Sequence, residues 1–85
     1  MGKYVVYIIQ SESSGRYYVG CTSNLRQRLA SHNTGMVTST RKRGPWSIVY
    51  TEDFFSKERA LLREKQIKSY KGGEAFKKLV KRSVA

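Results

Sequence analysis

The sequence predicts an α/β chain of the α+β type: a small, mostly antiparallel sheet with helices packed on it, in the order β-β-α-β-α-α. Three observations predict this class. Residues 4–10 are apolar almost throughout, as in a central strand that is covered on both faces. Residues 16–21 and 46–54 are short segments rich in β-branched and aromatic residues. Apolar side chains recur at helical spacing between and after these strands. At 85 residues, we expect one domain, residues 1–85.

The first two strands are predicted to form a hairpin, because the loop SESSG at residues 11–15 consists of turn formers. If this loop is symmetric about residues 12 and 13, Tyr7 faces Tyr18 across the two strands. Opposed tyrosines are also ordinary cross-strand partners, so the pair alone does not predict a site. Gly20 is more informative, because a glycine inside a strand usually marks the close approach of a ligand or of another chain segment.

A helix is predicted over residues 22–35. Ser23 or Asn24 can cap its start, and Gly35 can end it. Leu25 and Leu29 lie four residues apart and therefore share the face that packs on the sheet.

Arg28 and His32 lie on the same helix, about 60° and about 20° to one side of Leu25 at helical spacing. Both side chains are therefore expected to point toward the sheet, as neighbours on one face. Each also has an ordinary explanation. Arg28 can lay its stem on apolar surface with its charge in water, and His32 can be a hydrogen-bonded histidine at the edge of the core.

A polar, basic loop over residues 36–45 precedes the strand at 46–54. It contains three adjacent cations, Arg41, Lys42 and Arg43. We expect these side chains to contact phosphate, although cations in a loop can also be simply solvated.

The helix predicted over residues 56–71 begins at the capping residue Ser56 and is broken by the two glycines that follow. Ala60, Leu61 and Ile67 define its apolar stripe, and Glu64 falls inside that stripe. A carboxylate that faces a core is costly unless it is paired or bound to a cation. Glu64 is therefore either half of a structural ion pair or a metal ligand or catalytic acid. A short basic helix, residues 74–82, closes the chain with Phe76, Leu79 and Val80 facing inward.

Charge is the strongest compositional signal. Seventeen Lys and Arg against six Asp and Glu give a formal net charge of +11, which favours a polyanionic partner. Nucleic acid is expected before an anionic membrane, because no predicted helix has a bulky apolar face to spare for lipid. The one cysteine, Cys21, excludes an internal disulfide, and with one histidine it cannot build a four-ligand zinc site. Both facts fit a reducing cytoplasm.

The singled-out residues together resemble the GIY-YIG nuclease superfamily. The two triplets that name it stand here as VVY, at residues 5–7, and YVG, at residues 18–20. Arg28, His32 and the helical Glu64 follow at matching places, and the match covers roughly residues 4–71. The chain looks most similar to the small standalone bacterial members without accessory domains, whose segments stand here as RGPWSIVY and REKQIKSYK.

The resemblance implies a three-stranded antiparallel sheet flanked by helices, and hydrolysis of phosphodiester bonds in DNA with one divalent metal ion, Mg²⁺ or Mn²⁺. It implies that Tyr7 or Tyr18 helps to activate the attacking water and that Arg28 contacts the scissile phosphate. It further implies that Glu64 binds the metal, and His32 matches a position held by His or Tyr in the family. A guanidinium suits this role, because it offers paired donors to the phosphoryl oxygens and keeps its proton.

The chain also departs from the family pattern. Val5 stands where the first triplet has glycine, and Cys21 stands where some relatives have Lys or His. The asparagine that excinuclease members carry near the domain end is missing.

DNA is the expected partner, with a protein partner left open and no membrane or small-molecule cofactor expected. Lysines of the last two helices are expected to track its backbone: Lys65, Lys68, Lys71, Lys77, Lys78 and Lys81. Such contacts carry no sequence information, so we expect weak, salt-dependent binding with little sequence preference.

Two alternatives stay open. The chain can be a non-catalytic nucleic-acid-binding module, or a subunit of a larger DNA repair complex. The substrate can also be RNA, since Mg²⁺, arginine and tyrosine serve either backbone.

Overall fold

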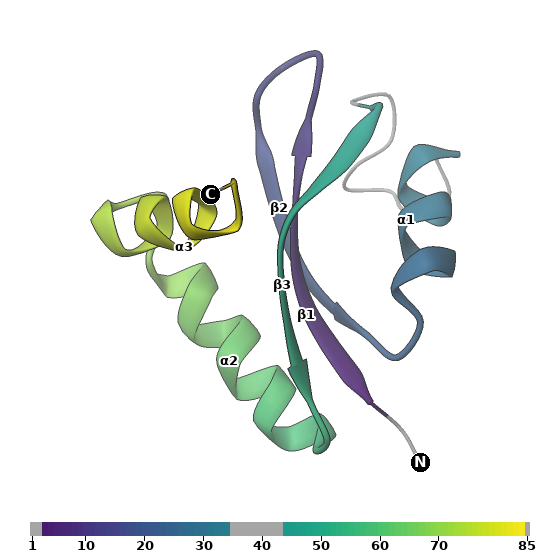
Figure 1. The fold of residues 1–85 in the computed structure, drawn as a ribbon, viewed down its shortest axis with the longest axis vertical. Coiled ribbons are helices and arrows are strands. Elements are labelled where there is room, and N and C mark those ends of the chain that lie inside the picture. The colour runs from purple at the N-terminus through teal and green to yellow at the C-terminus, as the bar shows by residue number, and fades with distance from the viewer. Residues whose placement is uncertain (1–2, 35–43, 85) are drawn as a thin grey trace.

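A computed structural model of the chain describes residues 3–34 and 44–84 (Figure 1). Along the chain its elements are β1 (Tyr4–Ser11), β2 (Tyr17–Thr22), α1 (Leu25–Asn33), β3 (Trp46–Phe54), α2 (Lys57–Ser69) and α3 (Glu74–Val84). The α+β class and the order β-β-α-β-α-α are therefore confirmed. The strand at 46–54 has the predicted limits, whereas α1 and α2 are a few residues shorter at their ends than predicted.

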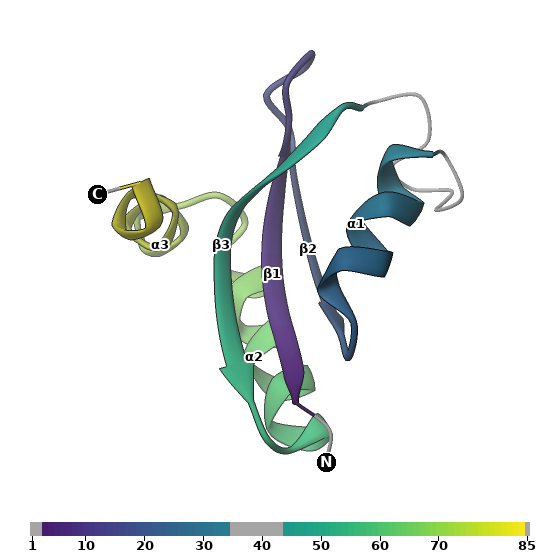
Figure 2. The same cartoon turned by 45° about the vertical axis from the view of Figure 1, so that its right-hand side comes forward.

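The three strands form one antiparallel sheet in the order β2-β1-β3, so β1 is the central strand. Its side chains alternate between two separate core clusters. Val6 and Ile8 pack with residues of α2 and α3, whereas Tyr7 and Ile9 pack with Leu25 and its neighbours on α1. Figure 2 shows this layering, with α1 on one side of the sheet and α2 and α3 on the other. The apolar run of β1 is explained by this burial on both faces.

The register of the hairpin differs from the prediction. Tyr7 lies opposite Gly20, and Tyr18 lies opposite Ile9. The predicted opposition of Tyr7 and Tyr18 is therefore wrong. The two tyrosines still share a face, because partners two residues apart along a strand point to the same side.

Gly15 explains the shift. Its φ of +77° lies in the left-handed region, which glycine adopts without strain. Its amide donates to the Ser11 carbonyl at 2.9 Å, and the Ser11 amide donates to the Arg16 carbonyl at 2.8 Å. The turn therefore closes between Ser11 and Arg16. Its centre lies further along the chain than residues 12 and 13, where the prediction placed it.

Both capped helices begin where polar side chains satisfy their first amides. The Asn24 side chain accepts from the Gln27 amide at 3.1 Å, so Asn24 rather than Ser23 caps α1. Ser56 caps α2 as predicted. The predicted helix end at Gly35 and the cations Arg41, Lys42 and Arg43 lie outside the described residues.

The apolar stripe of α2 is narrower than predicted. Ala60 and Ile67 are fully buried, but Leu61 is 45% exposed, so its assignment to the stripe is wrong. α2 is fully buried only at Ala60 and Ile67, which lie seven residues apart on one narrow line, and Leu61 lies to the side of this line. On α3, Phe76 and Leu79 are buried as predicted, and Val80 packs against the same cluster. None of the helices in the described part of the chain has the length and hydropathy to cross a bilayer.

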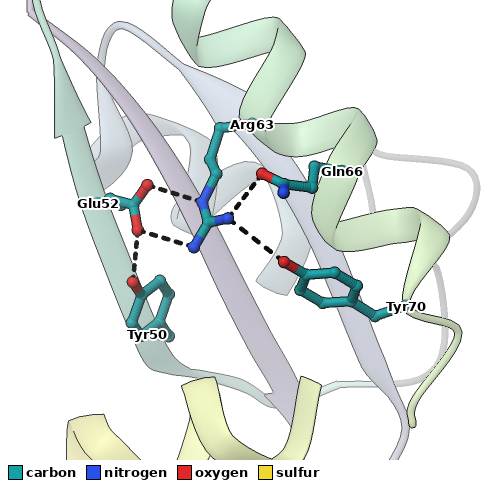
Figure 3. Close-up of polar contacts among 5 residues, drawn as sticks. All are labelled: Tyr50, Glu52, Arg63, Gln66 and Tyr70. Carbon is teal, nitrogen blue, oxygen red and sulfur yellow. Dashed lines mark hydrogen bonds and ion pairs between the residues drawn. The ribbon is translucent and has the colours of Figure 1, made fainter. Parts of the chain in front are cut away.

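A polar network fixes α2 against β3 (Figure 3). Arg63 donates through Nε to Glu52 at 2.9 Å, and the Tyr50 hydroxyl donates to the same carboxylate at 2.5 Å. Arg63 also donates to the Gln66 side chain at 2.7 Å and reaches the Tyr70 hydroxyl at 3.5 Å. Arg63 is held toward β3. Successive helix residues point about 100° apart, so the next residue, Glu64, points away from β3.

Candidate active site

The Tyr7 side chain lies over Gly20. A Cβ atom built on Gly20 would come within 2.4 Å of the Tyr7 hydroxyl oxygen and 2.5 Å of Tyr7 Cζ. No real side chain tolerates such contacts, so only glycine admits the tyrosine ring in this place. The close approach that Gly20 indicated is therefore made by the neighbouring strand.

His32 meets the two tyrosines at this face of the sheet. Its Nε2 lies 2.8 Å from the Tyr7 hydroxyl, and both side chains are about 1% exposed. The His32 ring packs edge-on against Tyr18, with ring centroids 4.7 Å apart, and the two tyrosine rings lie 6.4 Å apart. Thus His32 points toward the sheet, and it joins Tyr7 and Tyr18 in one cluster.

Asn33 fixes the end of α1 that carries His32. Its side-chain oxygen accepts from the Trp46 amide at 2.6 Å, and its side-chain nitrogen donates to the Trp46 carbonyl at 3.3 Å. This two-bond clamp attaches α1 to the first residue of β3 and thereby limits the positions that the His32 ring can take.

Arg28 lies at the rim of the cluster, one turn before His32. Arg28 is exposed, yet the hydroxyls of Tyr7 and Tyr18 are near enough to raise the pKa of its guanidinium. The interaction with Tyr7 is the largest influence that raises the pKa of Arg28. The arginine therefore has its charge held over the phenols while remaining accessible to an anion from solvent.

The environment of the cluster raises the pKa of Tyr7 and lowers the pKa of His32. Burial raises the pKa of Tyr7 above 10, Arg28 opposes this, and the charges of Tyr18 and Glu64 add to it. Burial, followed by the charge of Arg28, lowers the pKa of His32 below 6.5. At neutral pH the cluster is thus a protonated phenol beside a neutral imidazole.

Glu64 lies on α2, on the side of the sheet opposite to α1. Its side chain is 17% exposed and forms an ion pair with Lys68 at 2.8 Å. Its charge raises the pKa of Tyr7 and also that of the Cys21 thiol on β2. α2 packs on β1 and on the edge strand β2, the two strands that carry Tyr7 and Cys21.

Among the predicted site residues, Glu64 is the one whose side chain could hold a divalent metal ion. The described residues contain no group of three or more His, Cys, Asp or Glu side chains that would hold a metal by themselves. Magnesium needs only one or two carboxylates when waters and a substrate phosphate complete its shell. Lys68 is 55% exposed, so its long side chain can swing its ammonium into solvent when a metal ion takes its place at Glu64.

Of the predicted backbone-binding lysines, those in α2 and in the turn after it are all exposed: Lys65, Lys68 and Lys71. One further candidate was missed by the sequence prediction. Tyr17 precedes the second triplet, is 44% exposed and faces the side of the sheet opposite to Tyr18. Strand alternation already places it there, but the pattern of triplets drew attention only to its neighbour.

Comparisons with known proteins agree with this arrangement. A family model described as the GIY-YIG catalytic domain matches residues 3–78. A UPF0213 protein from Staphylococcus haemolyticus is 36% identical over 83 residues, which are 96% of this chain and 100% of that protein. One from Halobacterium salinarum is 44% identical over 64 residues, 74% of this chain and 82% of that protein.

A solved structure is also similar. The solution NMR structure of a UPF0213 protein from Bacillus halodurans superposes with a TM-score of 0.59 at 32% identity. The match covers 93% of this chain and 83% of that one.

Proposed function

The chain belongs to the GIY-YIG family, a nuclease superfamily, and from this premise we propose that it is an endonuclease that hydrolyses phosphodiester bonds in DNA. We further propose that it needs one divalent metal ion, Mg²⁺ or Mn²⁺, and shows little sequence preference. The observation that carries the proposal is the cluster of Tyr7, His32 and Arg28, with the charge of Glu64 acting on it.

The proton path follows from the contacts of Tyr7. We assign the Tyr7 hydroxyl as the donor to His32 Nε2, 2.8 Å away, because the nearby guanidinium of Arg28 carries only donors and lowers the pKa of Tyr7. A neutral His32 accepts that proton as the Tyr7 oxygen takes a proton from the attacking water. The relay removes the need for a free phenolate, which is scarce at neutral pH because burial raises the pKa of Tyr7.

Arg28 acts on the phosphate. Negative charge grows on the phosphoryl oxygens in the transition state, and a fixed guanidinium at the rim stabilises it with paired donors. Glu64 would hold the metal ion through its carboxylate. Such an ion supplies Lewis-acid stabilisation of the phosphate and offsets the carboxylate charge that raises the pKa of Tyr7. Tyr18 packs against His32 and holds its ring edge-on.

Cleavage of labelled DNA tests the proposal. Single-stranded, duplex, nicked and branched substrates are incubated at low salt with Mg²⁺, with Mn²⁺ or with chelator. We expect cutting that needs the metal and is lost in Glu64→Ala. Glu58→Ala removes an exposed acid from the first turn of the same helix and is the matched control, which should cut like the wild type. Equal cutting by both variants would remove Glu64 from the mechanism.

The ion pair between Lys68 and Glu64 supports a second candidate, a binding module without catalysis. If that pair persists on DNA, the carboxylate is not available to a metal. In this case Glu64→Ala leaves binding nearly unchanged, and no metal yields cut product. Lys68→Gln, assayed at saturating DNA so that its loss as a phosphate contact does not limit binding, separates the two candidates. It frees Glu64, and it therefore retains or raises metal-dependent cutting if the chain is a nuclease.

A further inference from the structure

A groove with aromatic and lysine side chains runs between β2 and the turn that joins α2 to α3. It consists of two adjoining hollows of about 290 and about 610 Å³, which share Tyr17, Gly72 and Phe76 in their walls. The first extends to Lys68, the ion-pair partner of Glu64. The second continues along α3. The larger volume lies within the usual range of about 300–1,000 Å³ for ligand sites.

Tyr17 forms an aromatic surface in this groove. Its ring packs against Phe76 with centroids 5.0 Å apart and an interplanar angle of 74°. Phe76 is buried, whereas Tyr17 is 44% exposed. An edge-to-face contact leaves at least one face of the Tyr17 ring uncovered by Phe76. The ring is thus held against Phe76 and remains partly open to solvent.

The charges around the groove favour an anion. Five lysines and one acid line its two parts: Lys68, Lys71, Lys77, Lys78, Lys81 and Glu74. An occupant that carries both repeated negative charge and flat apolar groups matches a lysine rim with an aromatic wall. Nucleic acid has this combination, and stacking on aromatic side chains with lysines along the backbone is the usual way to bind a single strand.

A duplex cannot use the Tyr17 ring, because its base faces are covered by stacking on one another. The groove also leads to the candidate active site. Lys68 lines its near end and is paired with Glu64, whose charge acts on Cys21 further along β2. A strand that follows the groove from α3 past Tyr17 therefore arrives at Glu64.

We propose that this groove binds single-stranded DNA adjacent to the bond that is cut, with an unpaired base stacked on Tyr17 and phosphates along the lysines of α3. The proposal deepens the proposed function and rests on it, since it names the form of DNA that the same site receives. Substrates with a single-stranded segment, such as flaps or overhangs, are then preferred to intact duplex.

Binding without cleavage tests the groove independently of catalysis. The full chain is titrated, with chelator present, into a short oligonucleotide carrying the fluorescent base 2-aminopurine, whose emission falls when it stacks. The same bases in a hairpin duplex serve as the comparison. Tyr17→Phe keeps the ring, whereas Tyr17→Leu keeps an apolar contact to Phe76 but cannot stack. Lys3→Gln is the matched charge control, because Lys3 is exposed, pairs with Asp53 and lines neither hollow.

We expect wild type, Tyr17→Phe and Lys3→Gln to bind the single strand alike and to quench its emission. Tyr17→Leu should bind about 5- to 150-fold more weakly, the range for losing one stacked base, without quenching. Its duplex binding should change little. Replacing Lys77 and Lys81 by Gln should reduce the salt slope of single-strand binding by about 0.7 for each lysine.

Equal quenching by Tyr17→Leu and wild type, with both folded by circular dichroism, would overturn the proposal. Tighter Tyr17-dependent binding of RNA of the same sequence would overturn its assignment to DNA. Failure of catalysis is a separate result. If Glu64→Ala and wild type both fail to cut but quench through Tyr17, the groove stands and the nuclease does not. If duplex DNA is cut and Tyr17→Leu has no effect on binding, the nuclease stands and the groove proposal does not.

Discussion

Gly20 is the residue on which the geometry of the site depends most directly. In Gly20→Ala the added methyl would lie 2.4 Å from the Tyr7 hydroxyl oxygen, so the ring must move. We expect a loss of stability of about 1–3 kcal/mol, as for other overpacked interiors, and loss of the Tyr7 contact to His32. Urea denaturation and the cleavage assay measure the two effects.

Gly44→Ala is the control for this change, because its nearest atoms would be 3.5 Å away, an ordinary contact distance. It should remain close to wild type in both assays. A Gly20→Ala protein with wild-type stability and cutting would show that Tyr7 does not need its present position.

His32 is the one histidine of the chain, so its titration can be followed without assignment ambiguity. We expect NMR of its ring to give a pKa below 6.5, because burial and then Arg28 disfavour the charged form. Since the neutral form accepts the Tyr7 proton, activity should be lost only as pH falls through this lowered pKa. In Arg28→Gln the pKa of His32 should rise part of the way, because burial remains. A His32 pKa at or above 6.5 would contradict this electrostatic account.

The site residues show how much the sequence could predict at this scale. Helical spacing placed Arg28 and His32 on one face, and the structure brings both to Tyr7. The spacing did not indicate that His32 would be fully buried while Arg28 stays exposed. That difference depends on how closely α1 approaches the sheet, which is fixed by distant contacts such as the Asn33 clamp on Trp46.

At the scale of elements, α2 is oriented by two sets of contacts. Ala60 and Ile67 pack in the core, and Arg63 pairs with Glu52 on β3. The contact between Arg63 and Glu52 is about a quarter exposed, with side-chain exposures of 23% and 28%. Arg63→Ala leaves a partly buried carboxylate without its main partner. We expect a loss of about 1–3 kcal/mol, between the values of exposed and buried pairs, measured by urea denaturation.

The pair of Lys3 and Asp53 provides the comparison for α2, because both side chains are more than half exposed. Lys3→Ala should cost less than about 1 kcal/mol. If Arg63→Ala costs no more than Lys3→Ala, the network on β3 does not hold the helix, and the orientation of Glu64 depends on the apolar contacts of Ala60 and Ile67.

Element types were predictable because the apolar periods along the chain are distinct, but the hairpin register was not. Register depends on where the turn closes, which here involves the positive φ of Gly15 and the hydrogen bonds of Ser11, and the loop SESSG offers several turns with similar composition. A shift of the turn moved Tyr18 from opposite Tyr7 to the diagonal position. Leu61 was misplaced for a related reason, since helical spacing gives an angle around α2 but not the width of its contact.

At the scale of the whole molecule, the surplus of seventeen basic over six acidic side chains predicts how binding depends on salt. If the six lysines predicted to track the backbone (Lys65, Lys68, Lys71, Lys77, Lys78 and Lys81) each contact one phosphate, the logarithm of the duplex binding constant should fall against the logarithm of salt concentration with a slope of about −5. Backbone contacts do not distinguish bases, so unrelated duplexes of equal length should bind alike. Fluorescence anisotropy between 50 and 200 mM salt, where about a thousandfold loss is expected for six contacts, measures both properties. A slope near zero, or strong preference for one duplex, would mean that base contacts rather than the lysines of these helices dominate binding.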